Sequence, residues 1–240
     1  VRTGQPTVTY TYDLNGNMTE DSTGRTLTWN ALDQLTNITG GGVTSTSFTY
    51  DPLGRRRTWQ RGATTRTYWY DGLDVLSNTA SSFLNGAGLD EPLQFTNAGT
   101  TRLYLQDALG STTRLSSTAG ALQTRYDYNS YGRYEGGIAN PSTINFFSYT
   151  GREDDLTGLY YFRNRYYDPN LESFISDDPL GDNQRYVGGN PLIYTDPFGL
   201  YGSNEARRTH SRDYSQNNIN GAGLVLGSGA EAGAGKNGIS

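Results

Sequence analysis

Two copies of the motif Asp-Pro-x-Gly stand near the end of the sequence and supply the residues best suited to chemistry. They occupy residues 178–181 (Asp-Pro-Leu-Gly) and 196–199 (Asp-Pro-Phe-Gly). If Asp178 and Asp196 meet in the folded chain, one carboxylate can act as a base towards water while its protonated partner polarises a carbonyl group. The alternative interpretation is structural, because Asp often caps a turn that a later Gly completes.

Other side chains carry weaker signals for chemistry. The chain has no Cys and one His, His210, which argues against a thiolate or zinc site, and no cofactor is indicated. Trp29, Trp59 and Trp69 could stack on sugars, but an aromatic stripe on strands more often forms the core of a sheet. The formal net charge of -5 disfavours nucleic-acid binding, and no apolar run is long enough to span a membrane.

A repeated pattern of aromatic residues and Asp predicts the elements that carry these motifs. The pair Tyr-Asp recurs at residues 12–13, 50–51, 70–71, 126–127 and 167–168. Aromatic side chains alternate before the Asp, as at Phe48 and Tyr50, which is the period of a strand with one buried face. An Asp-x-x-Gly turn follows, as from Asp51 to Gly54, and a second strand returns. Each unit is therefore a β-hairpin.

The composition agrees with an all-β chain. The 240 residues include 31 Gly and 19 Tyr, and 34% are hydrophobic, which is typical of strands and turns rather than of a helical bundle. We expect almost no helix in residues 1–145, a surface loop at 136–145 and a short helical piece around Asn183–Val187. The sequence begins at Val1 in the middle of the pattern without an initiator Met, so we expect a fragment or a processed product.

The repeat and several longer motifs resemble those of RHS (rearrangement hot spot) proteins. Residues 50–55, Tyr-Asp-Pro-Leu-Gly-Arg, are similar to the YD repeat of that family. Residues 88–93 (Gly-Leu-Asp-Glu-Pro-Leu) and 104–111 (Tyr-Leu-Gln-Asp-Ala-Leu-Gly-Ser) resemble two further family segments. Residues 157–169, 174–181 and 190–200 resemble, in order, the RHS-associated core signature. The resemblance covers residues 7–200.

The resemblance implies a fold and a division of the chain. The fold would be a curved, spiralling antiparallel sheet of YD hairpins, part of an RHS shell, with a compact core-associated segment towards the C-terminus. The hairpin repeats would occupy residues 1–145 and the core-associated segment residues 146–200. Residues 201–240 would be the Gly/Ala-rich start of a variable toxin region. The repeats are too few to close a chamber, so we expect the closing end of a shell.

The resemblance also implies a reaction at the two Asp-Pro motifs. In the family, these motifs resemble an intramolecular aspartyl protease that cuts after the Leu of the second motif. Asp178 and Asp196 would then be catalytic, and the bond between Leu200 and Tyr201 would be the cleavage site. The protein would be a single-turnover autoproteolytic enzyme.

One departure from the family pattern concerns an arginine. Family members commonly read Gly-Arg-Phe before the first Asp-Pro motif, and this chain has Glu172-Ser173-Phe174. An arginine beside a carboxylate pair orients it and holds one member ionised. Arg165 and Arg185 are the candidates to supply this support, and the neighbouring Asp177 is interpreted as a solvated bystander.

The function implied is a shell that encapsulates and releases a C-terminal toxin. Its partners would be its own C-terminal toxin segment, the rest of the shell and a secretion apparatus, with no nucleic acid and no membrane span. We expect it to be secreted or at the surface of a bacterial cell. The alternative is a non-enzymatic cell-surface adhesion or carbohydrate-binding module, because YD repeats also occur in wall-associated bacterial proteins and in animal teneurins.

Overall fold

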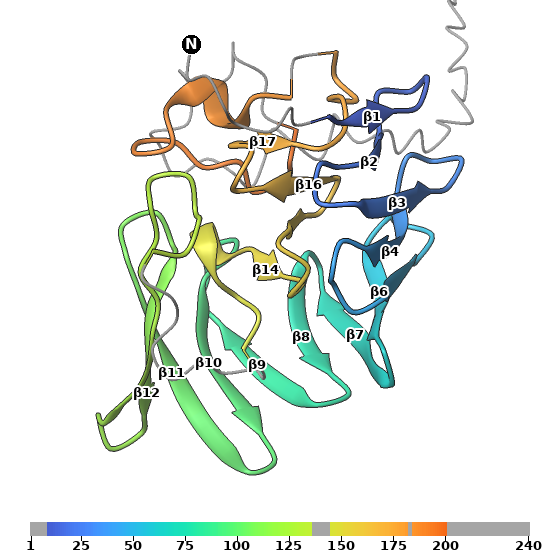
Figure 1. Cartoon of the computed structure of the whole chain (residues 1–240). Helices are drawn as coiled ribbons and strands as arrows, with labels where there is room; N and C mark the ends of the chain where they lie inside the picture. The colour runs from blue at the N-terminus through green and yellow to red at the C-terminus, as the bar shows by residue number, and fades with distance from the viewer. Residues whose placement is uncertain (1–8, 136–144, 182–183, 201–240) are drawn as a thin grey trace, which may run out of the picture. The chain divides into compact units, whose positions relative to one another are not determined.

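The computed structural model describes residues 9–135, 145–181 and 184–200. Thirteen strands form one antiparallel sheet in which each strand pairs with the next along the chain (Figure 1). No helix occurs among the described residues before Asn145, so the predicted all-β fold of hairpins is confirmed. The strands are β1 (Thr11–Tyr12), β2 (Met18–Glu20), β3 (Arg25–Trp29), β4 (Leu35–Gly40), β5 (Thr46–Tyr50), β6 (Arg56–Arg61), β7 (Thr64–Asp71), β8 (Asp74–Asn78), β9 (Ser81–Asn85), β10 (Pro92–Asn97), β11 (Thr100–Gln106), β12 (Thr112–Ser117) and β13 (Leu122–Arg125).

A second, smaller antiparallel sheet lies in the C-terminal part of the described chain. It consists of β14 (Glu153–Asp154), β15 (Tyr160–Phe162), β16 (Arg165–Asp168) and β17 (Ser173–Phe174). Two 3-10 turns, Tyr149–Gly151 and Tyr186–Gly189, flank this sheet. The second turn overlaps the end of the helical piece predicted around Asn183–Val187, whose Asn183 lies outside the described residues. Of the predicted loop at 136–145, the structure describes Asn145, which is buried.

The Asp-x-x-Gly turn has the hydrogen bonds and the positive φ at glycine that the sequence predicts. At residues 51–54, the Gly54 N–H donates to the Asp51 carbonyl at 2.9 Å, and Gly54 has a φ of 79°. The Asp51 Oδ1 atom accepts from the N–H groups of Leu53 and Arg55. The Tyr126-Asp127 pair departs from the pattern, because the neighbouring Asn129 caps the turn there and accepts from the N–H groups two and four residues on.

At three turns, a tyrosine before the turn links one hairpin to the preceding one. The hydroxyl of Tyr50 donates to the Leu35 carbonyl at 2.6 Å, that of Tyr70 to the Arg56 carbonyl at 2.7 Å, and that of Tyr128 to the Thr112 carbonyl at 2.9 Å. Each acceptor begins the return strand of the earlier hairpin. A bulge shifts the strand register at the same place in the second case, between Thr49 and Tyr50 opposite Arg56.

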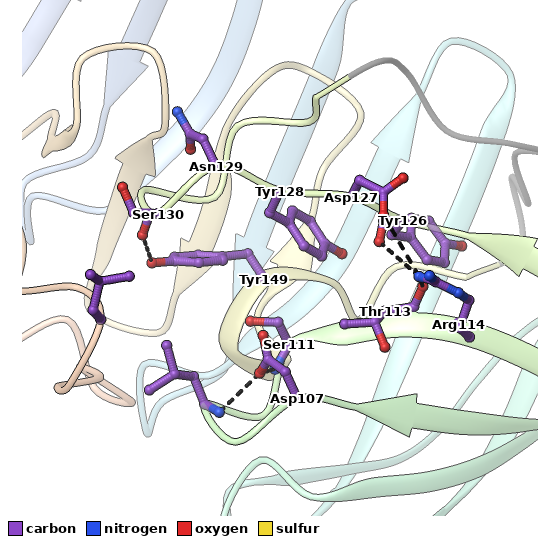
Figure 2. Close-up of a pocket in the computed structure, with 12 residues that line it drawn as sticks. Asp107, Ser111, Thr113, Arg114, Tyr126, Asp127, Tyr128, Asn129, Ser130 and Tyr149 are labelled. Carbon is purple, nitrogen blue, oxygen red and sulfur yellow. Dashed lines mark hydrogen bonds and ion pairs between the residues drawn. The ribbon is translucent and has the colours of Figure 1, made fainter.

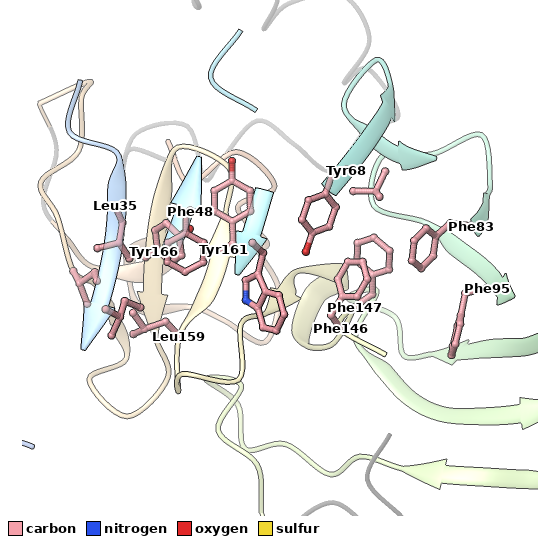
Figure 3. Close-up of a cluster of buried hydrophobic side chains, with 14 of the residues drawn as sticks. Leu35, Phe48, Tyr68, Phe83, Phe95, Phe146, Phe147, Leu159, Tyr161 and Tyr166 are labelled. Carbon is pink, nitrogen blue, oxygen red and sulfur yellow. The ribbon is translucent and has the colours of Figure 1, made fainter. Parts of the chain in front are cut away.

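The buried face of the large sheet packs against the C-terminal segment rather than against solvent (Figure 3). Phe83 and Phe146 meet edge to face with ring centroids 5.3 Å apart, and Phe48 and Tyr166 lie at 5.4 Å. Such aromatic pairs add stability beyond their buried area. The buried residues of this core are Met18, Leu27, Leu35, Ile38, Phe48, Trp59, Tyr68, Val75, Phe83, Phe95, Tyr104, Leu115, Tyr126, Phe146, Phe147, Leu159, Tyr161, Tyr166 and Ile175.

The three tryptophans divide between the two faces of the sheet. Trp59 is buried in the core, and Trp29 packs against the core while its indole N–H donates to the Met18 carbonyl. The prediction of a core position is wrong for Trp69, which is 43% exposed on the opposite face, because its neighbour Tyr68 takes the inward position in β7. The guanidinium of Arg57 lies over the Trp69 ring at 5.6 Å.

Three buried ionic clusters join the hairpin sheet to the C-terminal segment. Arg25 in β3 bonds Asp168 at 2.7 Å. Arg56 in β6 bonds both Glu153 and Asp155, and Asp90, in the loop before β10, bonds both Arg152 and Arg163. A buried charge left without its partner is costly, so these pairs fix the position of the segment on the sheet.

Candidate functional site: the Asp178 and Asp196 carboxylates

Asp178 and Asp196 are both buried, and each begins a turn. The Asp178 Oδ1 atom accepts from the Leu180 N–H at 2.9 Å, and Asp196 Oδ1 accepts from the Leu200 N–H at 3.1 Å. The Asp51 turn uses its Oδ1 atom in the same way. One oxygen of each carboxylate therefore has the turn-capping role that the sequence offered as the structural interpretation.

The second oxygens of the two carboxylates converge on Arg165. The Arg165 Nη2 atom lies 2.8 Å from Asp178 Oδ2 and 3.6 Å from Asp196 Oδ2. Arg165 begins β16, its side chain is 1% exposed, and its guanidinium stacks on the Phe174 ring at 3.7 Å. The structure thus brings Asp178, Asp196 and Arg165 together out of water, where charge interactions are strongest.

A difference in the turn sequence explains where the second oxygen of Asp196 points. In the Asp51 turn, the side chain four residues after the Asp bonds the second oxygen: Arg55 donates to Asp51 Oδ2 at 2.8 Å. The residue at that place after Asp196 is Leu200, whose side chain has no donor group. Asp196 therefore turns its Oδ2 atom towards Arg165.

Three consecutive side chains hold the backbone that leads to Leu200. Arg163 donates to the Pro197 carbonyl, Asn164 donates to the Phe198 carbonyl at 2.9 Å, and the Arg165 Nε–H donates to the Gly199 carbonyl. We call residues 163–165 the carbonyl clamp. Arg163 and Asn164 form the turn between β15 and β16, and Arg165 begins β16; the two strands pair antiparallel through Phe162 and Arg165.

The clamp requires glycine at position 199. Gly199 has a φ of 64°, and a Cβ atom there would lie 2.7 Å from the Phe162 carbonyl oxygen. That distance is shorter than any normal van der Waals contact, so a side chain would push the Leu200 backbone away from Asp196.

The other predicted site residues lie elsewhere or outside the described chain. Arg185 is exposed, and with Glu172 it lines a separate open hollow of about 410 Å³. Asp177 is exposed and accepts from the Gln184 side chain at 2.9 Å. Tyr201 lies outside the described residues, as does His210.

The structure gives local roles to Glu172 and Ser173, the residues that depart from the family pattern. Glu172 is exposed and has a φ of 57°, a conformation that suits the Gly commonly found there in the family. Ser173 donates from its hydroxyl to the Gln184 carbonyl at 2.8 Å. The guanidinium beside the two carboxylates comes instead from Arg165.

Sequence reasoning missed Asp90, Arg163 and Asn164. Asp90 lies in the segment Gly-Leu-Asp-Glu-Pro-Leu, which the sequence distinguishes only by its resemblance to a family segment. Burial lowers the pKa of Arg163, but the Asp90 carboxylate outweighs this and raises the pKa above its ordinary value. A positive φ of 60° at the non-glycine Asp90 is the structural sign of a constrained position.

A second open hollow, whose walls do not include Asp178 or Asp196, is lined by residues of β12 and of the segment after β13 (Figure 2). It measures about 520 Å³, and its walls include Tyr126, Tyr128 and Tyr149. Tyr126 and Tyr149 are each 3% exposed, and the Tyr149 hydroxyl donates to the Ser130 carbonyl. Sugar binding by stacking needs an accessible ring face, and these two rings do not offer one.

Comparisons with known proteins find bacterial toxin proteins among the chain's relatives. No family model matches it, and no helix in the described ranges has the length and apolar character to cross a membrane. The chain is 32% identical over 209 residues to the tRNA3(Ser)-specific nuclease WapA of Bacillus spizizenii, covering 78% of this chain and 9% of WapA. It is 27% identical over 228 residues to toxin subunit YenC1 of Yersinia entomophaga, covering 79% of this chain and 23% of YenC1.

Among solved structures, the TcdB2-TccC3-Cdc42 crystal structure matches with a TM-score of 0.65 at 23% identity. The match covers 81% of this chain and 11% of that one. The chain therefore spans a small part of the length of the proteins that it resembles. It is a relative of RHS-type toxin proteins, and its fold is that of the RHS shell in Tc toxin structures.

Proposed function

We propose that the chain is the C-terminal part of an RHS shell that encloses a C-terminal toxin and cuts its own Leu200–Tyr201 bond once. The observation that carries the cleavage proposal is the convergence of Asp178 and Asp196 on one buried guanidinium, beside the backbone of Leu200. The toxin assignment is supported by relatives that are named as a nuclease and a toxin subunit.

The two carboxylates have different surroundings, and this assigns them different roles. Arg165 lies closer to Asp178 than to Asp196, so we give Asp178 the role of the base towards a water molecule. Asp196 carries the proton and donates it to the carbonyl oxygen of Leu200, the residue whose N–H it already binds.

The reaction is hydrolysis of a peptide bond. Asp178 takes one proton from water, and the hydroxide oxygen bonds to the Leu200 carbonyl carbon while Asp196 protonates the carbonyl oxygen. The carbon–nitrogen bond then breaks: the nitrogen of Tyr201 takes the proton from Asp178 and leaves as an amine, one hydroxyl proton of the intermediate returns to Asp196, and Leu200 becomes a carboxylic acid that ionises. The carbonyl clamp keeps residues 197–199 in place, so the new end stays in the site and a second turnover is blocked.

The location and partners follow from this role. A shell that carries a toxin acts outside the cell that makes it, so we place it as secreted or at the surface of a bacterium. Its partners are its own C-terminal segment, the remaining shell and a secretion apparatus. Reading the gene beyond the codon for Ser240 tests the cargo: an unrelated domain there supports a toxin shell, and further repeats of the same kind contradict it.

Intact mass spectrometry of the purified chain tests the cleavage. The wild type should yield one piece ending at Leu200 and one beginning at Tyr201. Asp178→Asn and Asp196→Asn keep the turn-capping oxygen and should each slow cleavage about a hundredfold or more. Asp177→Asn is the matched control, because that neighbouring carboxylate is exposed, and it should cleave like the wild type. A wild type that stays at full length for days contradicts the proposal.

A further inference from the structure

The carbonyl clamp is itself held by a residue of the hairpin sheet. Asp90 accepts from Arg163 through both carboxylate oxygens, at 2.6 Å to Oδ1 and 3.0 Å to Oδ2. A bidentate contact of this kind fixes both the position and the plane of a guanidinium. The same Arg163 Nη1 atom that bonds Asp90 also donates to the Pro197 carbonyl.

Asp90 is fixed in turn by its close contact with the C-terminal segment. Its side chain is 8% exposed and bonds Arg152 as well as Arg163. A Cβ atom on Gly151 would lie 2.7 Å from the Asp90 carbonyl oxygen, so the two backbones touch. Arg152 also reaches the Pro197 carbonyl, at 3.5 Å. Two guanidinium groups thus meet one carboxylate and share the Pro197 carbonyl as a further acceptor.

A chain of contacts therefore leads from the hairpin sheet to the bond proposed to be cut. Asp90 holds Arg163, Arg163 holds the Pro197 carbonyl, and the following turn presents the Leu200 N–H to Asp196. Asp90 comes from the loop between β9 and β10, whereas the clamp belongs to the smaller sheet. The contacts between Asp90 and Arg163 exist when the two sheets have docked.

We propose that Asp90 is a positioning residue that couples self-cleavage to the docking of the C-terminal segment on the hairpin sheet. This inference rests on the proposed cleavage after Leu200. Before docking, Arg163 lacks its carboxylate partner and the Pro197 carbonyl is not held in register with the aspartate pair. Cleavage then follows assembly of the shell around the segment, because a displacement of about 1 Å at a reacting group can lower a rate about a hundredfold.

The test compares Asp90→Asn with Asp168→Asn in the full chain. Asp168 is a matched control, because its buried pair with Arg25 also joins the segment to the sheet but lies outside the clamp. We expect Asp90→Asn to slow the appearance of the piece ending at Leu200 about 10- to 100-fold. Asp168→Asn should lower the melting temperature by a similar amount and leave the cleavage rate within about threefold of the wild type. Asp90→Glu, which keeps the charge, should recover part of the lost rate.

Hydrogen exchange separates a failure of this inference from a failure of the proposed cleavage. In an Asp196→Asn background the chain stays intact, and the N–H groups of Phe198, Gly199 and Leu200 should exchange faster when Asp90→Asn is added than when Asp168→Asn is added. This comparison reports the clamp even in a protein that never cleaves.

Three results overturn the proposal. The first is that Asp90→Asn cleaves at the wild-type rate. The second is that Asp90→Asn and Asp168→Asn, at equal stability, slow cleavage equally. The third is that Asp90→Asn leaves the hydrogen-exchange rates of residues 198–200 unchanged. If Asp90→Asn does not fold, Arg163→Lys takes its place, because a lysine cannot hold Asp90 and the Pro197 carbonyl with one planar group. Wild-type cleavage in Arg163→Lys then overturns the proposal.

Discussion

Asp155 offers a test of how the C-terminal segment is held on the hairpin sheet. Its side chain is 2% exposed and bonds Arg56, which also bonds Glu153, so two buried carboxylates share one guanidinium. Burial raises the pKa of Asp155 to about 7; the Arg56 charge lowers this pKa, and the Glu153 charge raises it. At neutral pH, the folded protein therefore carries a carboxyl group close to its titration midpoint inside the core.

The sign of the effect follows from proton binding. A raised carboxyl pKa means that the folded state binds the proton more tightly than the unfolded state does, so this group makes the free energy of unfolding fall as pH rises. The fall spans the range from the ordinary value of 3.8 to about 7. At roughly 1.4 kcal/mol per pH unit, the full effect is about 4 kcal/mol.

The perturbation is Asp155→Asn, which keeps the shape and removes the charge. Above about pH 7.5 this variant should unfold with a free energy up to about 4 kcal/mol larger than that of the parent, and near pH 4 the two should be similar. Urea titrations followed by circular dichroism measure the difference, and both chains carry Asp196→Asn so that cleavage does not complicate them. Glu153→Gln should also flatten the pH dependence, because it leaves Asp155 alone with Arg56.

Two results refute this reasoning. One is a parent stability that does not change between about pH 5 and pH 8, which would mean that Asp155 is ionised throughout. The other is a loss of stability in Asp155→Asn at pH 8, which would mean that attraction to Arg56 outweighs the cost of burying the charge.

Two further substitutions test local features. Tyr50→Phe removes the hydroxyl that bonds the Leu35 carbonyl and should lower the free energy of unfolding by about 1–2 kcal/mol in urea titrations. The control is Tyr12→Phe, at an exposed tyrosine, which should change that free energy by less than about 0.5 kcal/mol. Gly199→Ala should slow cleavage about tenfold or more, because its Cβ would meet the Phe162 carbonyl. Gly99→Ala has a similar φ with open space around it and should cleave normally, so equal slowing in mass-spectrometric time courses would contradict the role of the close approach.

The hairpins could be predicted from the sequence because their information is local. In the Asp51 turn, the carboxylate, its two N–H donors and the glycine at positive φ all lie within five residues. The prediction that Asp127 caps its turn is wrong, and this error also has a local cause. A second aromatic–polar pair, Tyr128-Asn129, stands two residues later and makes the same turn with an amide oxygen.

The candidate site could be predicted as two motifs but not as a geometry. The two Asp-Pro turns can be recognised in the sequence. The contact of both aspartates with Arg165, however, depends on the pairing of β15 with β16 and on the packing of Phe174. Asp90 lies far from the clamp in sequence, and nothing in its own segment indicates a partner at Arg163. Contacts between residues this far apart in the sequence depend on how the sheets pack, and local sequence patterns do not indicate them.

The structural and the catalytic interpretation of Asp178 and Asp196 are compatible, because they concern different atoms. Oδ1 of each residue caps its turn, as at Asp51, and Oδ2 faces Arg165. At Asp196 the fourth residue after the Asp is Leu200, which supplies no side-chain donor, and the distant Arg165 lies within reach of both second oxygens, so a turn used in the repeats becomes a candidate reactive site. The choice of substitution follows from this division. Substitution by alanine would remove both oxygens, so a slower cleavage could come either from the lost turn cap or from the lost carboxylate. Asparagine keeps an oxygen for the turn and removes the proton that the two carboxylates would share.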